Sequence, residues 1–392
     1  MTIISVPQAF NEDDLYVDLR SIFGQPLFLK CEGFNFAGSI KLKAAAEMVA
    51  GAERDGRLTP KSVLVESSSG NLGVALSMIA ASKGYRFLCV TDSRCNLPTR
   101  LLMEALGSQV HVITEPDAKS GFLDARLNYL RALCAADDRY VWLDQYTNPG
   151  NWMAHYRTTA PAIARQFPQL DVLFVGSGTT GTLMGCARYF REWRRPVRVV
   201  AVDSVGSVTF GGKPGRRMIP GLGMSIHPPL LDTSYVDEAV CVEEADTIRA
   251  CHRLARHGFL LGGSTGTVVS GAVGWLARHD AGELTAVAIA PDLGSATSTP
   301  STRPTGSRAC TATTCSAPMS WPPGPRPSTR APGAASHPSP DHGPGHHGHR
   351  CRPGDRHRTE PGRGARRRRV HRDPALEPRG GDRRRRARGD GP

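Results

Sequence analysis

The chain has 392 residues and a formal net charge of +13, which is enough length for one large or two medium domains. Residues 1–294 hold 29 Lys and Arg against 29 Asp and Glu, whereas residues 295–392 hold 20 Arg, no Lys and 7 acidic residues. Residues 1–294, called the body below, are therefore formally neutral. A nucleic-acid-binding surface, which needs clustered basic residues, is not expected on the body.

Seven of the ten cysteines are scattered through the body, without the close pairs of a zinc site or the framework of a small disulfide-rich protein. The sequence shows no charged-then-apolar leader and no long apolar span. We therefore expect a soluble, cytoplasmic protein with no membrane segment, no metal centre, and reduced, mostly structural thiols.

In chain order, the body alternates short apolar runs with amphipathic or Ala-rich stretches. The runs predict strands buried on both faces, at 62–65, 87–91, 109–113, 171–175, 197–202 and 284–290. The stretches between them predict helices at 42–52, 72–83, 98–106, 121–136, 159–167, 181–193, 245–257 and 267–278. This alternation is typical of an α/β fold in which helices cover parallel strands.

Lys41 follows the small residues Gly38 and Ser39 and precedes the first predicted helix. Small residues let the backbone approach a ligand closely, and a lysine whose pKa is lowered by burial can form a Schiff base. An arbitrary lysine is more often a solvated surface charge, and we interpret Lys43 as structural. Lys41 is interpreted as catalytic because three further small-residue loops follow it.

These loops, rich in Gly, Ser and Thr, fall where an apolar run ends or just before a helix, at residues 66–73, 176–182 and 262–267. Such positions bind ligands in α/β proteins, because helix N-termini present free N–H groups to anions. The first loop has donors that suit a carboxylate, although an ordinary polar turn has the same composition. Ser264 in the last loop is either a helix N-cap or a neutral hydroxyl that faces a ligand.

The loop at 176–182 supports two interpretations. It fits G-x-G-x-x-G, follows a predicted strand, opens a helix and is followed by Asp203 at the end of the next strand, as in a dinucleotide site. On this segment alone, NAD binding and a cradle for one phosphate are about equally supported. The hydroxyls of Thr179, Thr180 and Thr182 add donors around one compact phosphate, and a dinucleotide loop usually occurs near the start of its domain. The whole chain therefore favours a monophosphate.

Together these segments resemble the cysteine synthase family, the fold-type II pyridoxal-phosphate (PLP) enzymes that replace a β-substituent on serine derivatives. The resemblance runs over about residues 15–294. It includes Asp-Gln-Tyr-Thr-Asn-Pro-Gly-Asn at 144–151, where the sulfhydrylases carry Gln-Phe-x-Asn-Pro-Ala-Asn, and Pro-Gly-Leu-Gly at 220–223, similar to their Gly-Ile-Gly loop over the cofactor. It implies two α/β domains with parallel-rich sheets, a smaller subdomain at about 40–145 inserted in the larger one, and a homodimer.

The resemblance also implies roles for single residues. Lys41 would form the Schiff base with PLP, Asn71 would bind the ring hydroxyl, and Ser264 would leave the pyridine nitrogen unprotonated, which favours β-elimination over transamination. The residues implied in binding the amino-acid substrate are Ser67, Ser68, Ser69, Gly70 and Gln145. Those implied in binding the cofactor phosphate are Gly178, Thr179, Thr180, Gly181 and Thr182.

Three departures separate the chain from cysteine synthases. Lys41 is followed by Leu-Lys instead of Asp-Arg, its lead-in is Asn-Phe-Ala-Gly instead of Asn-Pro-Gly-Gly, and Tyr146 replaces a phenylalanine. The Gly-Ser-Ile-Lys-Leu-Lys form looks more like a subgroup that makes 2,3-diaminopropionate precursors for siderophores and peptide antibiotics. Those enzymes join O-phospho-L-serine to L-glutamate: the first substrate displaces the lysine from PLP, the lysine removes the α-proton, and phosphate leaves.

Two alternatives stay open beside this activity. The first uses sulfide as the nucleophile, as in a cysteine synthase or phosphoserine sulfhydrylase. The second, from another class, is an inactive or NAD-binding module.

An amino-acid nucleophile brings carboxylates that sulfide lacks, so cationic or hydroxyl groups are expected at the mouth of the site. The candidates are Arg126, Tyr146 and either Arg216 or Arg217. Arginine suits this purpose because its planar fork pairs bidentately with a carboxylate or phosphate. An ordinary surface role is equally compatible with the sequence for each of these arginines.

Residues 295–392 form an Arg- and Pro-rich tail that lacks the apolar periodicity of a packed domain, so we expect it to be disordered. Its first eight residues read Ser-Ala-Thr-Ser-Thr-Pro-Ser-Thr, where the family commonly has Glu-Arg-Tyr-Leu-Asp-Thr-Val-Tyr. If the family segment is written GAG CGC TAC CTC GAC ACC GTC TAC C and its first base is dropped, it encodes the observed residues in order. We therefore hypothesise a frameshift at or near codon 294, with an authentic basic tail as the alternative.

Overall fold

The computed structural model describes residues 3–10, 12–117, 121–193, 196–279 and 282–294. All of them belong to one unit of the chain, Met1–Ser316. The predicted tail, its disorder and the proposed frameshift lie outside the described residues. Among the described residues, no helix is both long and apolar enough to span a membrane.

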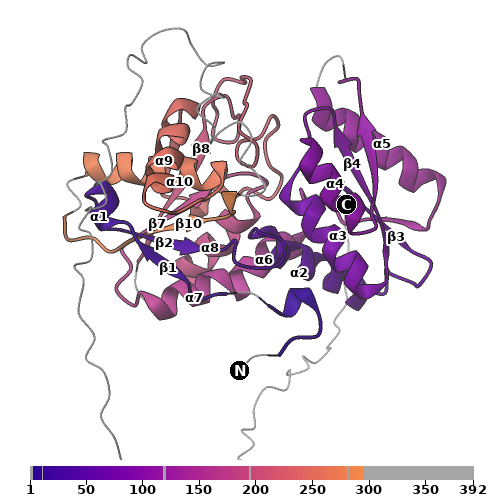
Figure 1. The fold of residues 1–392 in the computed structure, drawn as a ribbon, viewed down its shortest axis with the longest axis horizontal. Helices are drawn as coiled ribbons and strands as arrows, with labels where there is room; N and C mark the ends of the chain where they lie inside the picture. The colour runs from indigo at the N-terminus through magenta and orange to yellow at the C-terminus, as the bar shows by residue number, and fades with distance from the viewer. Residues whose placement is uncertain (1–2, 11, 118–120, 194–195, 280–281, 295–392) are drawn as a thin grey trace, which may run out of the picture. The chain divides into compact units, whose positions relative to one another are not determined.

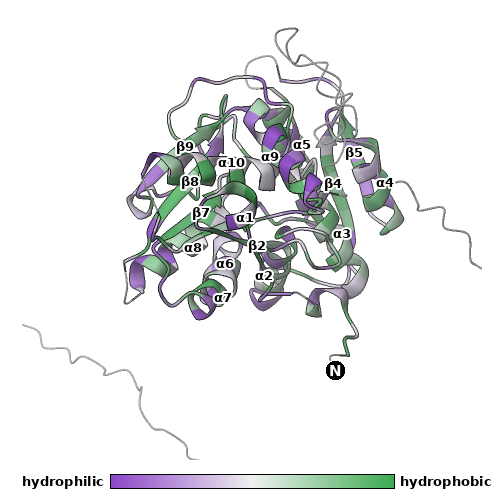
Figure 2. Ribbon diagram, turned by 60° about the vertical axis from the view of Figure 1, so that its left-hand side comes forward, coloured by the Kyte–Doolittle hydropathy of each residue, from purple (hydrophilic) through white to green (hydrophobic). Residues whose placement is uncertain are grey.

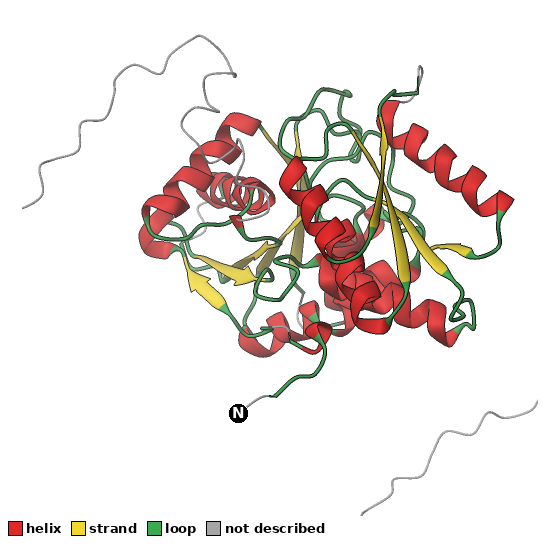
Figure 3. Ribbon diagram, turned by 45° about the vertical axis from the view of Figure 1, so that its right-hand side comes forward, coloured by secondary structure: helices red, strands yellow, loops and turns green. Residues whose placement is uncertain are grey.

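Two sheets form the framework, and Figure 3 shows their strands as two separate groups with helices around each. The larger sheet has the order β1-β2-β10-β7-β8-β9 and the smaller one β5-β4-β3-β6. All neighbouring strands are parallel except β1 and β2, which are antiparallel. The strands are β1 (Tyr16–Asp18), β2 (Leu27–Cys31), β3 (Val63–Ser67), β4 (Arg86–Asp92), β5 (Gln109–Ile113), β6 (Tyr140–Trp142), β7 (Val172–Gly176), β8 (Arg198–Ser204), β9 (Glu238–Val242) and β10 (Ala286–Ala290).

Helices connect most of these strands (Figure 1). They are α1 (Arg20–Phe23), α2 (Lys41–Arg54), α3 (Asn71–Lys83), α4 (Leu97–Ala105), α5 (Gly121–Ala136), α6 (Pro149–Arg157), α7 (Thr159–Gln166), α8 (Gly181–Glu192), α9 (Glu244–Arg256) and α10 (Gly263–Arg278), with short 3-10 helices η1 (Pro7–Ala9) and η2 (Thr233–Tyr235). The parallel α/β class expected from the sequence is confirmed.

The central strands β7 and β10 of the larger sheet are buried on both faces, which explains why they are almost continuously apolar. Alternate residues of β7 contribute to two different cores: Phe174 to the core that includes α10, and Leu173 to the core that includes α7 and α8. The smaller sheet is similar, with Leu64 facing α2 and α3 and Val65 facing the α5 side. In Figure 2 strands β7 and β8 are coloured as hydrophobic, whereas α5 and α9 carry hydrophilic turns.

A buried ionic cluster ties the start of α2 to β2. The Nζ atom of Lys43 lies 2.7 Å from Glu32 Oε2 and 2.5 Å from Asp13 Oδ1, and Lys30 Nζ lies 3.2 Å from Glu32 Oε1. Removing one partner of a buried ion pair typically costs about 3–5 kcal/mol, because the other charge is left uncompensated. Lys43 therefore holds the first turn of α2, at the position that presents Lys41.

Candidate active site

Four helices that follow the predicted motifs begin without a side-chain cap. These are α2, α3, α8 and α10, and none accepts a capping hydrogen bond at its N-cap side chain. By contrast, the side chains of Asn96 and Asn148 cap α4 and α6. First-turn N–H groups have no partner within their own helix, so uncapped N-termini are suited to an anionic ligand.

Lys41 is the first residue of α2 and is partly buried. Burial lowers the pKa of Lys41 to about 8, and the nearby Glu66 carboxylate opposes that shift. Its lead-in is fixed to the segment after β10: Ile40 N–H donates to Pro291 O at 2.8 Å, and Leu293 N–H donates to Gly38 O at 3.1 Å. The lysine therefore has a fixed backbone and an amine that is partly neutral near pH 8.

Glu66, at the end of β3, is fully buried next to Lys41 and was not predicted as a site residue. It accepts hydrogen bonds from Ser67 N at 2.8 Å, Trp142 Nε1 at 3.2 Å and Gln145 N at 3.0 Å. Burial raises its pKa to about 7 despite these donors. In sequence, Glu66 directly follows the apolar run at 62–65, where an acidic residue looks like part of an ordinary turn. Glu66 joins the first loop to the segment after β6.

The first loop is brought together with two of the predicted substrate-binding residues. Gln145 Nε2 donates to Ser67 O at 2.7 Å, and Ser67 Oγ lies 3.5 Å from Tyr146 Oη. The Ser68 hydroxyl accepts from Gly73 N at 2.9 Å and Gly70 N at 3.3 Å, so it stabilises the turn itself. Ser69, like Gly70 and Asn71, is only partly buried.

The loop after β7 has a strained backbone and tightly fitted glycines. Thr180 has φ of 67°, in the left-handed region that a β-branched residue rarely adopts. A Cβ on Gly178 would lie 3.0 Å from Gly221 O, and one on Gly181 would lie 2.1 Å from Asn151 Oδ1. Such outliers persist where the surroundings enforce them and cluster at ligand sites.

Side chains from α6 support this loop. Asn151 Nδ2 donates to Thr179 Oγ1 at 3.0 Å, and His155 Nε2 lies 3.2 Å from Thr182 Oγ1. Burial, with the charges of Lys43 and Lys41, lowers the pKa of His155 well below its usual value, so the ring is neutral. The sequence did not predict α6, and neither residue was proposed as a support.

Ser264 is the second residue of α10, whose N-cap is Gly262. The helix begins four residues earlier than expected, so the interpretation of Ser264 as an N-cap is wrong. Its Oγ lies 3.5 Å from Pro220 O, and a Cβ on Gly221 would come within 2.2 Å of it. The buried Asp292 lies behind it, 3.5 Å from Asn71 Nδ2, and connects the second and fourth predicted motifs.

The three cationic or hydroxyl candidates differ in position. Arg126 on α5 is 6% exposed and forms an ion pair with Asp92 at 3.5 Å, and its charge acts on the Tyr146 hydroxyl. Its Nε and Nη1 atoms are buried without a hydrogen-bond partner among the described residues. Arg217 instead donates to Gly206 O and, at 3.1 Å, to Ser225 Oγ, both in its own loop.

Tyr146 is itself buried, and burial raises its pKa to about 12. It packs with Leu123, Leu127 and Met224, so α5 and the loop after β8 meet around it. The hydroxyl is therefore neutral at physiological pH and can both donate and accept. The Tyr146 hydroxyl lies next to Ser67 and is influenced by the charge of Arg126, whereas Arg217 forms its hydrogen bonds within its own loop.

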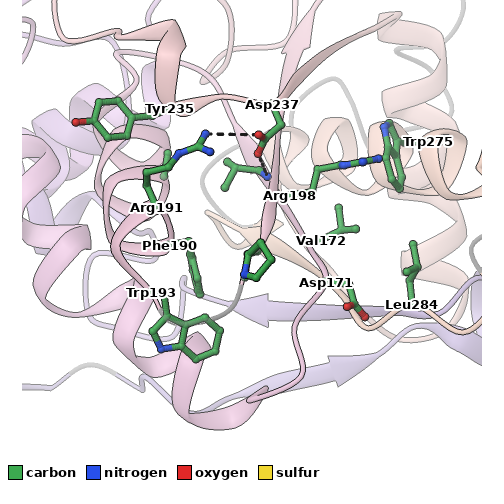
Figure 4. Close-up of a pocket in the computed structure, with 14 residues that line it drawn as sticks. Asp171, Val172, Phe190, Arg191, Trp193, Arg198, Tyr235, Asp237, Trp275 and Leu284 are labelled. Atoms are coloured by element: carbon green, nitrogen blue, oxygen red, sulfur yellow. Dashed lines mark hydrogen bonds and ion pairs between the residues drawn. The ribbon is translucent and has the colours of Figure 1, made fainter.

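A cavity of about 590 Å³ lies away from these loops. Figure 4 shows the side chains that line it. Its lining includes Val172 and Val199, near the amino ends of β7 and β8, whereas the loops described above follow the carboxyl ends. Its charged groups pair locally: Arg191 lies 3.5 Å from Asp237 (Figure 4) and Arg198 lies 3.5 Å from Glu238. This cavity is separate from the candidate site.

The residues fit PLP on observations of this structure. Connected segments supply the three kinds of group that PLP needs. These are the amine of Lys41 with its lowered pKa, the uncapped N-terminus of α8 next to the strained Thr180, and polar groups for a ring. The buried Ser177 hydroxyl, in the loop at residues 176–182, makes no hydrogen bond within the described part of the chain. A buried hydroxyl without a protein partner is one further group that a bound phosphate would satisfy.

Comparison with known proteins identifies the family of this chain. Residues 16–292 match the family described as pyridoxal-phosphate dependent enzyme. The chain is 39% identical over 271 residues to an N-(2-amino-2-carboxyethyl)-L-glutamate synthase of Ralstonia nicotianae, covering 68% of this chain and 80% of that protein. It is 40% identical over 260 residues to a synthase of the same name from Cupriavidus metallidurans, covering 65% and 76%.

Similar solved structures belong to the same class of enzyme. An O-ureido-L-serine synthase has a TM-score of 0.68 and 30% identity, covering 75% of this chain and 93% of its own. An O-acetylserine dependent cystathionine β-synthase from Helicobacter pylori has a TM-score of 0.68 and 26% identity, covering 75% and 97%. The chain belongs to the pyridoxal-phosphate-dependent enzymes and has their fold-type II architecture.

Proposed function

We propose that this protein joins O-phospho-L-serine and L-glutamate to N-(2-amino-2-carboxyethyl)-L-glutamate, releasing phosphate, as a source of 2,3-diaminopropionate for a siderophore or antibiotic. The observation that carries this proposal is the identity of 39% and 40%, across most of the body, to two synthases of that name. A β-replacement reaction also agrees with the PLP-dependent family of the chain.

When bound, PLP supplies an electron sink that stabilises negative charge at the α-carbon of an amino acid. Lys41 would hold the cofactor and move the α-proton, because an amine with a pKa of about 8 exchanges protons readily near neutral pH. Asn71 would bind the ring hydroxyl and Ser264 would face the ring nitrogen. The phosphate of the cofactor would lie against the α8 N-terminus, at Gly178, Thr179, Thr180, Gly181 and Thr182.

The amino-acid substrate would bind at the first loop. The donors of Ser67, Ser68, Ser69 and Gly70 would hold its α-carboxylate, together with Gln145. Of these, the Ser68 hydroxyl is engaged within the turn and the Ser68 backbone N–H donates to Val90 O at 3.0 Å, so the partly buried Ser69 is the expected main contact.

The buried Arg126 favours a substrate that carries a second anion. Its Nε atom makes no hydrogen bond within the described residues, its Nη1 atom is in the 3.5 Å ion pair with Asp92, and its charge acts on Tyr146, next to Ser67. A buried guanidinium with free donors suits a phosphate or a carboxylate. We propose that Arg126 and Tyr146 bind the phosphate of phosphoserine, and that Arg217 binds a carboxylate of glutamate after its loop rearranges.

A sulfhydrylase activity is the second candidate, because one similar solved structure, 29% identical, is that of a hydrogen sulfide-producing enzyme from Fusobacterium nucleatum. The test is to incubate the PLP-loaded protein with phosphoserine and either glutamate or sulfide, and to determine the product by mass spectrometry. The proposal expects the glutamate adduct and stoichiometric phosphate. Cysteine as the only product would overturn it in favour of the second candidate.

A different experiment tests the alternative of a module without PLP chemistry. The purified protein should be yellow, and the visible absorption band should be absent in Lys41→Ala but present in Lys61→Ala, which changes an exposed lysine. We also propose a cytoplasmic homodimer, for which light scattering at twice the monomer mass is the test.

A further inference from the structure

One buried carboxylate contacts two of the segments proposed to touch the cofactor ring. Asp292 follows β10 and is 1% exposed. Asn71 Nδ2 lies 3.5 Å from its Oδ2, and Thr265 Oγ1 donates to its Oδ1 at 3.1 Å. The Ser264 hydroxyl is also hydrogen-bonded to it. A Cβ on Gly262 would come within 2.3 Å of Oδ1, so the carboxylate fills the space at the start of α10.

The same segment holds the backbone that leads to Lys41. Asp292 forms an isolated antiparallel bridge with Ser39, and its neighbours Pro291 and Leu293 bond to the lead-in of the lysine at both sides of that bridge. Three elements that surround the proposed ring position, namely α2, α3 and α10, therefore meet at Asp292.

We infer that Asp292 is a positioning residue for the cofactor ring, acting through the side chains of Asn71 and Ser264. This inference rests on the ring-facing roles proposed above for these two residues. It does not depend on which nucleophile the enzyme uses.

Hydrogen-bond chemistry explains how one carboxylate can set both groups. The amide nitrogen of Asn71 carries two hydrogens, and a carboxylate only accepts. Donation of one hydrogen to Asp292 fixes the amide with its second hydrogen free for the ring hydroxyl. The Ser264 hydroxyl has a single hydrogen, and both of its contacts, Asp292 and Pro220 O, are acceptors. Asp292 therefore fixes the position of the Ser264 oxygen, whose single hydrogen is the donor that an unprotonated ring nitrogen requires.

Keeping this carboxylate buried also costs folding free energy. Burial raises the pKa of Asp292 to about 6, so keeping it ionised at neutral pH costs the folded protein free energy. Because the pKa is raised from its ordinary value, this cost is absent below about pH 4, grows between about pH 4 and 6, and is constant above that range. Asp292→Asn removes the charge and keeps the shape. The apoprotein should therefore melt at the same temperature or higher, although the cofactor binds less well.

The test measures cofactor affinity, the visible circular dichroism of bound PLP, and the melting temperature of the apoprotein for Asp292→Asn. We expect the PLP dissociation constant to rise on the order of tenfold, as for loss of a charge-assisted hydrogen bond, and the dichroic band to weaken because the ring is less fixed. Asp203→Asn is the matched control. It changes another buried carboxylate at the carboxyl end of a strand in the same sheet, bonded to Ser204 N at 2.8 Å.

Three results would overturn the inference: wild-type affinity and dichroism in Asp292→Asn, a fall in apoprotein melting temperature that accounts for the lost affinity, or the same loss in Asp203→Asn. A double-mutant cycle with Asn71→Ala gives a second criterion. If Asp292 acts through Asn71, the two losses of affinity are less than additive, and strict additivity contradicts the mechanism. A wild-type protein that binds no PLP would refute the proposed function instead.

Discussion

The charge on Lys41 depends on two opposing effects. Burial favours the neutral amine, and the carboxylate of Glu66 favours the ammonium form, leaving a pKa of about 8. Since only the free amine attacks the aldehyde of PLP, the rate at which the apoprotein takes up cofactor should rise with pH, with a midpoint near 8. Stopped-flow absorbance across a pH series measures this midpoint.

Glu66→Gln tests the second effect. Removing the negative charge destabilises the ammonium form, so the midpoint of cofactor uptake should move to lower pH. The amide can still accept hydrogen bonds from the neighbouring N–H groups, although only through one oxygen. An unchanged or higher midpoint would show that Glu66 does not act on the charge of Lys41.

Arg126→Lys keeps the positive charge beside Asp92 and removes the planar fork. If Arg126 binds the phosphate of phosphoserine, this substitution should raise KM for phosphoserine about 10- to 100-fold, as for loss of charge-assisted hydrogen bonds. Arg131→Lys, on the exposed side of the same helix, is the control. Steady-state kinetics decide, and an equal effect of both variants would contradict the assignment.

The sequence indicated the residues that begin helices α2, α3, α8 and α10. It did not indicate the two buried carboxylates that contact these segments. Glu66 and Asp292 lie at strand ends, where an acidic residue in sequence looks like an ordinary turn residue. Only the folded chain shows that each is fully buried and which loops it connects. The positions of Arg126 and Arg217 could not be distinguished either, because burial of a guanidinium depends on packing between distant segments.

The loop between β7 and α8 stores strain at Thr180, and a pair of substitutions measures it. Thr180→Gly and Thr180→Ala both remove the hydroxyl and methyl groups, but only glycine adopts a φ of 67° without steric cost. The glycine variant should be more stable than the alanine variant by about 1 kcal/mol, the left-handed penalty less the backbone entropy of glycine. Urea unfolding of the apoproteins is the measurement, and an alanine variant of equal or greater stability would contradict a strained loop.

Elements with a clear period were predicted, and β5 (Gln109–Ile113) matches its expected range. Three of the missed strands, β2, β6 and β9, lacked that signal for separate reasons. β2 includes the buried Lys30, which reads as a surface residue until Glu32 is placed beside it. β6 has only three residues, and β9 is an edge strand with half-exposed residues. α6 opens with Pro149 and Gly150, a pair that suggests a turn.

The larger sheet places β10 between β2 and β7, so the last described strand is central. We propose that the smaller sheet belongs to a subdomain of about residues 40–145 inserted in the larger domain. The charge of the whole chain comes from residues 295–392, which lie outside the described residues. Their composition predicts that resequencing the gene around codon 294 will reveal a shifted frame. An intact frame that encodes this tail would reject the frameshift.

The most direct test of the whole interpretation is to find the lysine that carries the cofactor. Reduction of the PLP-loaded protein with borohydride makes the attachment permanent, and peptide mapping by mass spectrometry locates it. We expect the added mass on Lys41. Attachment to Lys43 or to any other lysine, or no covalent attachment, would contradict the site described here.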